Sequence, residues 1–155
     1  GFELPVIDPD AYTPPGRYER FVVDGRLVIL DGAHNPQKMA GLVESLRADG
    51  LGPVAVMATL LQAPDTKLPA TLSVLAPLVG HLIVPEYVLG DGDKVKTSFP
   101  AEVVVEQARA LGIEAESVRS VAEGLDLLLS RPERDLVVTG SLYLASLVRP
   151  LLARR

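Results

Sequence analysis

Two short segments carry residue types that could recognise an anionic ligand. The first, Asp-Gly-Ala-His-Asn-Pro at 31–36, follows the apolar run 27–30 and leads into a stretch with helical periodicity. The second, Thr-Gly-Ser at 139–141, follows the apolar run 136–138 and begins the last expected helix. The N-terminus of a helix favours anions through its free N–H groups and its dipole. We therefore expect a ligand-binding face at the carboxyl ends of these two strands.

Three common phosphate-binding and nucleophile motifs are missing from the sequence. There is no Gly-x-x-x-x-Gly-Lys-Ser/Thr loop, no Gly-x-Gly-x-x-Gly turn and no Gly-x-Ser-x-Gly elbow. A complete nucleotide-phosphate cradle is therefore not expected within this chain, and a hydrolase triad is disfavoured. Taken alone, the residues predict an α/β domain with one anion-binding face.

Composition excludes several further classes. The 155 residues include 15 Lys and Arg against 20 Asp and Glu, a net charge of −5. An acidic chain lacks the positive field that nucleic acids and anionic membranes require, so neither is expected as a partner. The absence of cysteine fits a reducing, cytoplasmic location and excludes thiolate metal sites. The two histidines are far apart, at positions 34 and 81, so no metal site is predicted.

The elements that must position these segments alternate along the chain. Two β-rich runs around Asp24-Gly25 predict a hairpin, at 19–23 and 27–30. Further strands are expected at 53–59, 81–84, 114–118 (an edge strand) and 135–139. Helices are expected from 36 to about 50, from 69 toward 79, from 100 to about 111, from 121 and from 141. Residues 85–99 are expected to form a long loop, and Pro150 should kink or end the last helix.

Alternating strands and helices predict a Rossmann-like three-layer αβα domain. Its mixed sheet should be mostly parallel, with about six strands and the N-terminal hairpin at one edge. Residues 1–16 contain four prolines and no hydrophobic period, which is typical of a linker. We expect this linker to enter from an upstream domain.

Three motifs in this order resemble one family. They are Pro15-Gly16-Arg17, the segment 31–36 and Val-Thr-Gly-Ser-Leu-Tyr-Leu at 138–144. Together they resemble the C-terminal domain of bifunctional dihydrofolate synthase/folylpolyglutamate synthase, in the Mur ligase superfamily. The resemblance covers about residues 15–149. It implies a linker at 1–16 and a Mur ligase-like C-terminal domain at 17–155.

The resemblance also implies an activity. Enzymes of this family use ATP and Mg²⁺ to phosphorylate a carboxylate of dihydropteroate or folate, and the amine of L-glutamate then attacks the acyl phosphate. A central P-loop domain holds most of the ATP and Mg²⁺, and the C-terminal domain closes over it. The present chain would be that closing domain, inactive alone and at most a weak binder of ATP. Its partner would be a P-loop ATPase domain upstream in cis.

The family's functional residues match four positions here. The resemblance places Arg17 on the ATP phosphates and Asp31 on the nucleotide, where its carboxylate could accept from the ribose hydroxyls. It places His34 near the incoming glutamate and the reacting centre, as the catalytic candidate. It places Ser141 near the glutamate carboxylate.

Residues beside these four positions fit structural roles. Asn35 and Pro36 fit an N-cap and a first helical residue, and Ser141 could also act as a plain cap. Gly32 could allow close approach of a ligand or a positive φ. The loop 62–67 departs from the family's Asp-Lys-Asp pattern, so no role is assigned to its polar residues. The acidic segment 91–93 is expected to be a solvated loop rather than a cation site.

Two other functions stay open at this point. One is the matching domain of a peptidoglycan-building Mur ligase, which adds an amino acid to a UDP-linked acid. The other is a non-enzymatic α/β binding or regulatory module that keeps the fold without the chemistry.

Overall fold

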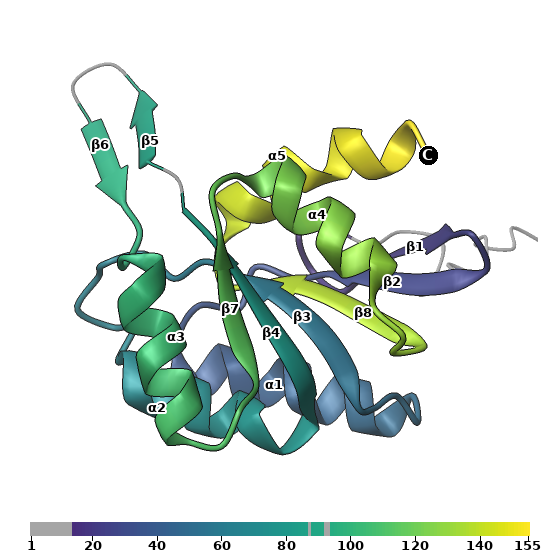
Figure 1. Cartoon of the computed structure of the whole chain (residues 1–155), viewed down its shortest axis with the longest axis horizontal. Coiled ribbons are helices and arrows are strands. Elements are labelled where there is room, and N and C mark those ends of the chain that lie inside the picture. Colours follow the sequence, from purple (N-terminus) through teal and green to yellow (C-terminus); the bar gives the residue numbers. More distant parts are fainter. Residues whose placement is uncertain (1–13, 87, 92–93) are drawn as a thin grey trace, which may run out of the picture.

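The computed structural model describes residues 14–86, 88–91 and 94–155, and it shows a six-stranded sheet with the order β1-β2-β8-β3-β4-β7 (Figure 1). Its strands are β1 (Glu19–Val23), β2 (Arg26–Leu30), β3 (Val54–Ala58), β4 (Val79–Pro85), β7 (Ala115–Val118) and β8 (Asp135–Thr139). β1 pairs antiparallel with β2, and every other pair in this sheet is parallel. The predicted mixed sheet, with the hairpin at one edge and 114–118 at the other, is confirmed.

Helices cover both faces of the sheet. They are α1 (Pro36–Ala48), α2 (Leu68–Leu75), the short 3₁₀ helix η1 (Ala76–Leu78), α3 (Ala101–Ala110), α4 (Val121–Ser130) and α5 (Leu142–Ala153). Figure 1 shows α1, α2 and α3 on one face and α4 and α5 on the other. The expected three-layer αβα architecture is therefore confirmed. Among the described residues, no helix combines the length and apolar character needed to cross a membrane.

The central strands supply two separate cores. All five residues of β3 and of β8 are buried, as expected for strands covered on both faces. Alternation divides them, because successive side chains of a strand point to opposite faces. Val137 packs with the core under α1, α2 and α3, whereas Leu136 and Val138 pack with the core under α4 and α5.

The expected loop at 85–99 is wrong in detail, and Pro150 does not end the last helix. Within the expected loop 85–99, Val88–Asp91 (β5) and Lys94–Thr97 (β6) pair as an antiparallel hairpin, which projects from the body in Figure 1. Helix α5 also continues through Pro150 to Ala153. Buried Val148 and Leu152 lie on either side of the proline, and their packing offsets the backbone bond that Pro150 cannot make. Part of the acidic segment 91–93 lies outside the described residues.

One charged pair connects the last helix to the first strand. The carboxylate of Glu19 accepts from Nε of Arg149 at 3.0 Å and lies 2.9 Å from the arginine's second nitrogen. The same carboxylate accepts from the backbone N–H of Gly16 at 3.3 Å. Glu19 therefore connects α5 to the turn that precedes β1.

Candidate functional site

A cleft of about 480 Å³ lies where β2 ends and α1 begins. It is lined by the turn before β1, the β2–α1 turn, one face of α1 and the first residue of α5: Gly16, Arg17, Tyr18, Asp31, Gly32, Ala33, His34, Lys38, Gly41, Leu42, Ser45 and Leu142. Three predicted site residues, Arg17, Asp31 and His34, thus share one cleft. Ser141 does not line it, although the next residue does.

Asp31 is the most firmly held of these residues. Its Oδ2 accepts from the backbone N–H of Tyr18 at 2.9 Å, and its Oδ1 accepts from that of Ala33 at 2.8 Å. Burial raises the pKa of Asp31, while the two backbone hydrogen bonds and the charge of Arg17 oppose the rise. Each carboxylate oxygen can accept more than one hydrogen bond, so Asp31 can still bind a ligand hydroxyl.

Backbone bonds fix the turn that carries Asp31. The N–H of Asp31 donates to Val138 at 3.0 Å, continuing the β2–β8 ladder, and the N–H of Gly32 donates to Gly16 at 2.7 Å. A Cβ on Gly32 would lie 2.3 Å from Cδ2 of Leu142, and the residue has no positive φ. Gly32 therefore allows α5 to pack closely. Of the two alternatives for Gly32, a positive φ is wrong, and close approach of a ligand stays a prediction.

Gly140 fixes the neighbouring strand end. Its φ is +103°, and an added Cβ would lie 2.1 Å from the carbonyl oxygen of Thr59. Its N–H donates to the carbonyl of Ala33 at 2.9 Å, which ties the start of α5 to the β2–α1 turn. Only glycine fits this position without a backbone shift.

Arg17 lies exposed at the cleft. Its backbone N–H donates to Pro14 at 3.1 Å, which closes a turn. Within the described residues, its guanidinium makes no recorded hydrogen bond or ion pair, and its charge acts on Asp31. A guanidinium without such partners can bind a phosphate through two parallel hydrogen bonds.

His34 is held between two oxygen atoms. Its Nδ1 lies 3.2 Å from the carbonyl oxygen of Gly32, to which it donates. Its Nε2 lies 3.4 Å from Oδ2 of Asp65, which also accepts from the side-chain amide of Asn35 at 3.3 Å. The contact with Asp65 was not predicted, because that residue is 31 positions away along the chain.

The two predicted helix caps are confirmed. Oδ1 of Asn35 accepts from the N–H of Lys38 at 2.8 Å at the start of α1. Oγ of Ser141 accepts from the N–H of Leu144 at 3.0 Å at the start of α5, and Ser141 is buried. The structural role of Ser141 is thus shown, and its contact with glutamate stays a prediction.

Tyr18 belongs to the site but was missed. Its backbone N–H donates to Asp31, the residue lines the cleft and its φ is +47°. Its hydroxyl donates to Asp49 at 2.7 Å, and the guanidinium of Arg20 lies 5.2 Å from the ring centre. Burial raises the pKa of the Tyr18 hydroxyl, and the bond to Asp49 adds to the rise. Its position next to Arg17 was the only available signal.

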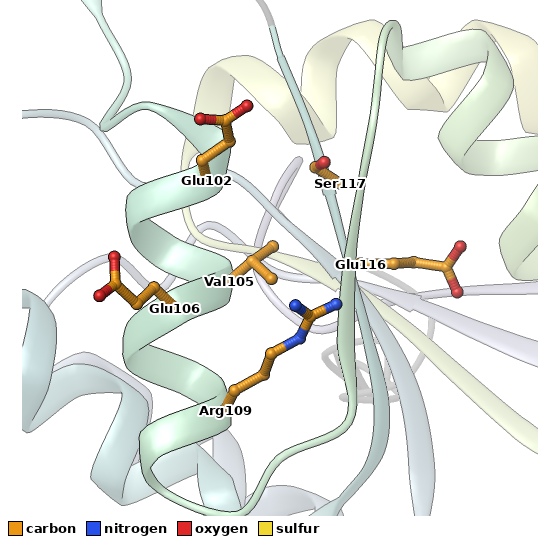
Figure 2. Close-up of a pocket in the computed structure, with 6 residues that line it drawn as sticks. All are labelled: Glu102, Val105, Glu106, Arg109, Glu116 and Ser117. Atoms are coloured by element: carbon orange, nitrogen blue, oxygen red, sulfur yellow. The ribbon is translucent and has the colours of Figure 1, made fainter.

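A second depression of about 410 Å³, the edge hollow, lies between α3 and β7 (Figure 2). Its lining residues are Glu102, Val105, Glu106, Arg109, Glu116 and Ser117. Figure 2 shows Arg109 pointing from α3 toward β7, where Nε and a terminal nitrogen donate to the carbonyl of Ala115 at 3.2 and 2.8 Å. Glu116 points away from α3, and its Oε2 lies 2.5 Å from Nε2 of His81. Arg109 and Glu116 therefore have partners within the protein.

No metal cluster is found in the part of the chain that the structure describes. There, no three His, Cys, Asp or Glu side chains lie close enough together to hold an ion. Any Mg²⁺ needed at the cleft would thus require ligands from the nucleotide or from another part of the protein.

The fold and the cleft define a class of protein. The chain belongs to the family described as Mur ligase, glutamate ligase domain, whose sequence profile matches residues 16–142. Mur ligase C-terminal architecture, expected from the motifs, is thus confirmed.

The particular relatives are folylpolyglutamate synthases. The enzyme of that name from Lacticaseibacillus casei is 31% identical over 148 residues, which are 89% of this chain and 29% of the relative. The crystal structure of folylpolyglutamate synthase from Thermotoga maritima is 27% identical with a TM-score of 0.70, covering 91% of this chain and 31% of that one. Escherichia coli FolC in complex with ADP is 27% identical with a TM-score of 0.68, covering 92% and 32%. The chain therefore spans about a third of the length of these relatives.

Proposed function

We propose that this chain is the glutamate ligase domain of an ATP-dependent enzyme that joins L-glutamate to dihydropteroate or folate. In this reaction the substrate carboxylate attacks the γ-phosphorus of ATP and ADP leaves. The glutamate amine then attacks the acyl phosphate, an amide forms and phosphate leaves with loss of a proton. The family membership and the similarity to a folylpolyglutamate synthase support the proposal.

One observation carries it: Arg17, Asp31 and His34 line a single cleft at the carboxyl end of β2. Ligands of open α/β sheets bind at such strand ends. In the proposed complex, Arg17 binds phosphate oxygens and Asp31 accepts from the ribose hydroxyls. His34 and Ser141 orient the glutamate at the reacting centre.

The residues of the cleft fit a nucleotide. Its volume of about 480 Å³ is within the usual range for small-molecule sites. An exposed arginine and a carboxylate held by backbone N–H groups supply the two chemistries that a phosphate and a ribose need. The ADP in the Escherichia coli FolC structure is consistent with this use.

Mg²⁺ fits less well on this domain, because the described residues offer no ligand cluster. When bound, Mg²⁺ neutralises phosphate charge during transfer. We assign the ion and most of the triphosphate to a P-loop ATPase domain, upstream in cis, in the part of the protein that this chain does not span. Such an enzyme would act in the cytoplasm, where folates are substrates.

The proposal implies that the 155-residue chain has no ligase activity and binds ATP weakly or not at all. Isothermal calorimetry with ATP tests this directly. Micromolar affinity for ATP would show that the phosphates are held here and would contradict the division between two domains.

Substrate-dependent ADP release by the full-length protein tests the reaction itself. We expect release that requires both L-glutamate and a folate or dihydropteroate. Turnover only with a UDP-linked acid would instead identify a peptidoglycan Mur ligase. No turnover with either class would favour a binding or regulatory module.

A further inference from the structure

The loop between β3 and α2 brings a carboxylate from outside the three motifs to the side chain of His34. Thr66 in this loop is fully buried. Its hydroxyl donates to the carbonyl of Leu61 at 2.8 Å, and its own carbonyl accepts from the hydroxyl of Thr71. These hydrogen bonds fix the backbone of Thr66, and the exposed residue Asp65 directly precedes it.

The side chain of Asp65 contacts two neighbouring residues although it is 59% exposed. Its Oδ2 accepts from Asn35 at 3.3 Å and lies 3.4 Å from Nε2 of His34. The hydrogen bond from Asn35 and, less strongly, the interaction with His34 lower the pKa of Asp65. The carboxylate is therefore ionised at neutral pH, accepts from Asn35 and lies beside Nε2 of His34.

Each ring nitrogen of His34 therefore lies close to an oxygen atom of another residue. The Gly32 carbonyl fixes Nδ1 at 3.2 Å, and Asp65 fixes Nε2. With Nδ1 alone bonded, the ring could still turn about its side-chain torsions, because 28% of the side chain is exposed. Asp65 removes that freedom.

We propose that Asp65 is a positioning residue that fixes the imidazole of His34 in the orientation it needs beside the cleft. Asp65 does not line the cleft, so it acts through His34. This inference rests on the proposed function, in which His34 lies near the incoming glutamate.

Steady-state kinetics of the full-length enzyme provide the main test. Asp65→Ala should lower kcat for glutamate-dependent ADP release about tenfold, the scale of a misplaced reacting group. KM for ATP should stay within about twofold, because Arg17 and Asp31 keep their contacts. The matched control is Asp126→Asn on α4. It removes an exposed carboxylate that accepts from Arg155 at 2.6 Å. It should leave kcat unchanged.

A double-mutant cycle separates positioning from general structural support. If Asp65 acts through His34, then the double variant His34→Ala/Asp65→Ala should be no slower than His34→Ala. Fully additive losses would overturn the inference, as would normal kcat in Asp65→Ala or an equal loss in Asp126→Asn.

The NMR signals of the histidine rings test the positioning role of Asp65 without depending on ligase activity. If the unmodified enzyme shows no glutamate-dependent ADP release, the proposed function fails. The ring signals of the 155-residue chain, which has only two histidines, then decide the inference. Asp65→Ala should shift the ring signals of His34 and leave those of His81 in place. Unchanged His34 signals would overturn the inference.

Discussion

The cleft and the edge hollow contain the same kinds of residue but use them differently. Each has an arginine and at least one carboxylate, and a histidine lies in the cleft (His34) or beside the edge hollow (His81). In the cleft, backbone N–H groups hold Asp31, and Arg17 keeps its guanidinium available. In the edge hollow, Arg109 bonds the Ala115 carbonyl and Glu116 pairs with His81. A site is thus marked by the polar groups left available after folding, and the number of charges nearby is a poor guide.

The largest effect should come from Gly140, which lies beside the cleft at the end of β8, when it is compared with Gly112, which precedes β7 beside the edge hollow. Gly140→Ala should lower the unfolding free energy by about 3–5 kcal/mol, because the new Cβ meets the Thr59 backbone at a positive φ. Gly112 also has a positive φ, of +82°, but has open space around it. Gly112→Ala should lower the unfolding free energy by only about 1–2 kcal/mol. Equal losses in urea unfolding would show that crowding at the strand end is unimportant.

The next largest effect concerns the two arginines. In the full-length enzyme, Arg17→Ala should lower kcat/KM for ATP by about 10²-fold or more, the scale of losing a preorganised charge contact. Its unfolding free energy should hardly change, because the guanidinium has no recorded hydrogen bond or ion pair within the described residues. Near-normal kinetics would remove Arg17 from the proposed site.

Arg109→Ala should give the opposite pattern with a smaller effect. Losing the two bonds to the Ala115 carbonyl should lower the unfolding free energy by about 1 kcal/mol. ATP and glutamate kinetics should be unchanged. A kinetic defect in this variant would give the edge hollow a function and end the contrast between the two regions.

The smallest effect is a pH dependence of Asp31. Burial raises its pKa in the folded protein, so the native state binds this proton at higher pH than the unfolded chain does. The stability that Asp31 contributes is then fully present below the ordinary aspartate pKa of about 3.9 and is lost as pH rises through the raised value. Urea unfolding of the unmodified chain and of Asp31→Asn should therefore converge or cross with rising pH. A difference that grows in favour of the unmodified chain would contradict this.

Much of the fold could be predicted because its signals are local. Continuous apolar runs identified the buried strands β3 and β8, and Asp24-Gly25 identified the hairpin. The position of β8 between β2 and β3 depends on crossovers between distant segments, which no local pattern encodes. The β5–β6 hairpin was missed because its strands have only four residues each and few apolar positions.

The residues of the candidate site also divide into those that a local motif predicts and those that depend on the packing of distant segments. Asp31 and His34 belong to one continuous motif, so their common location in the cleft could be predicted. Tyr18 could not, because its role depends on a positive φ and a backbone N–H, which the side-chain type does not reveal. Asp65 could not, because its contact with His34 depends on how α1 and the β3–α2 loop pack.

The pair formed by Glu19 and Arg149 connects α5 to the edge strand β1. Since Glu19 also bonds Gly16, a shift of α5 would pull directly on the turn that precedes Arg17. The position of the backbone beside Arg17 therefore depends on where α5 lies.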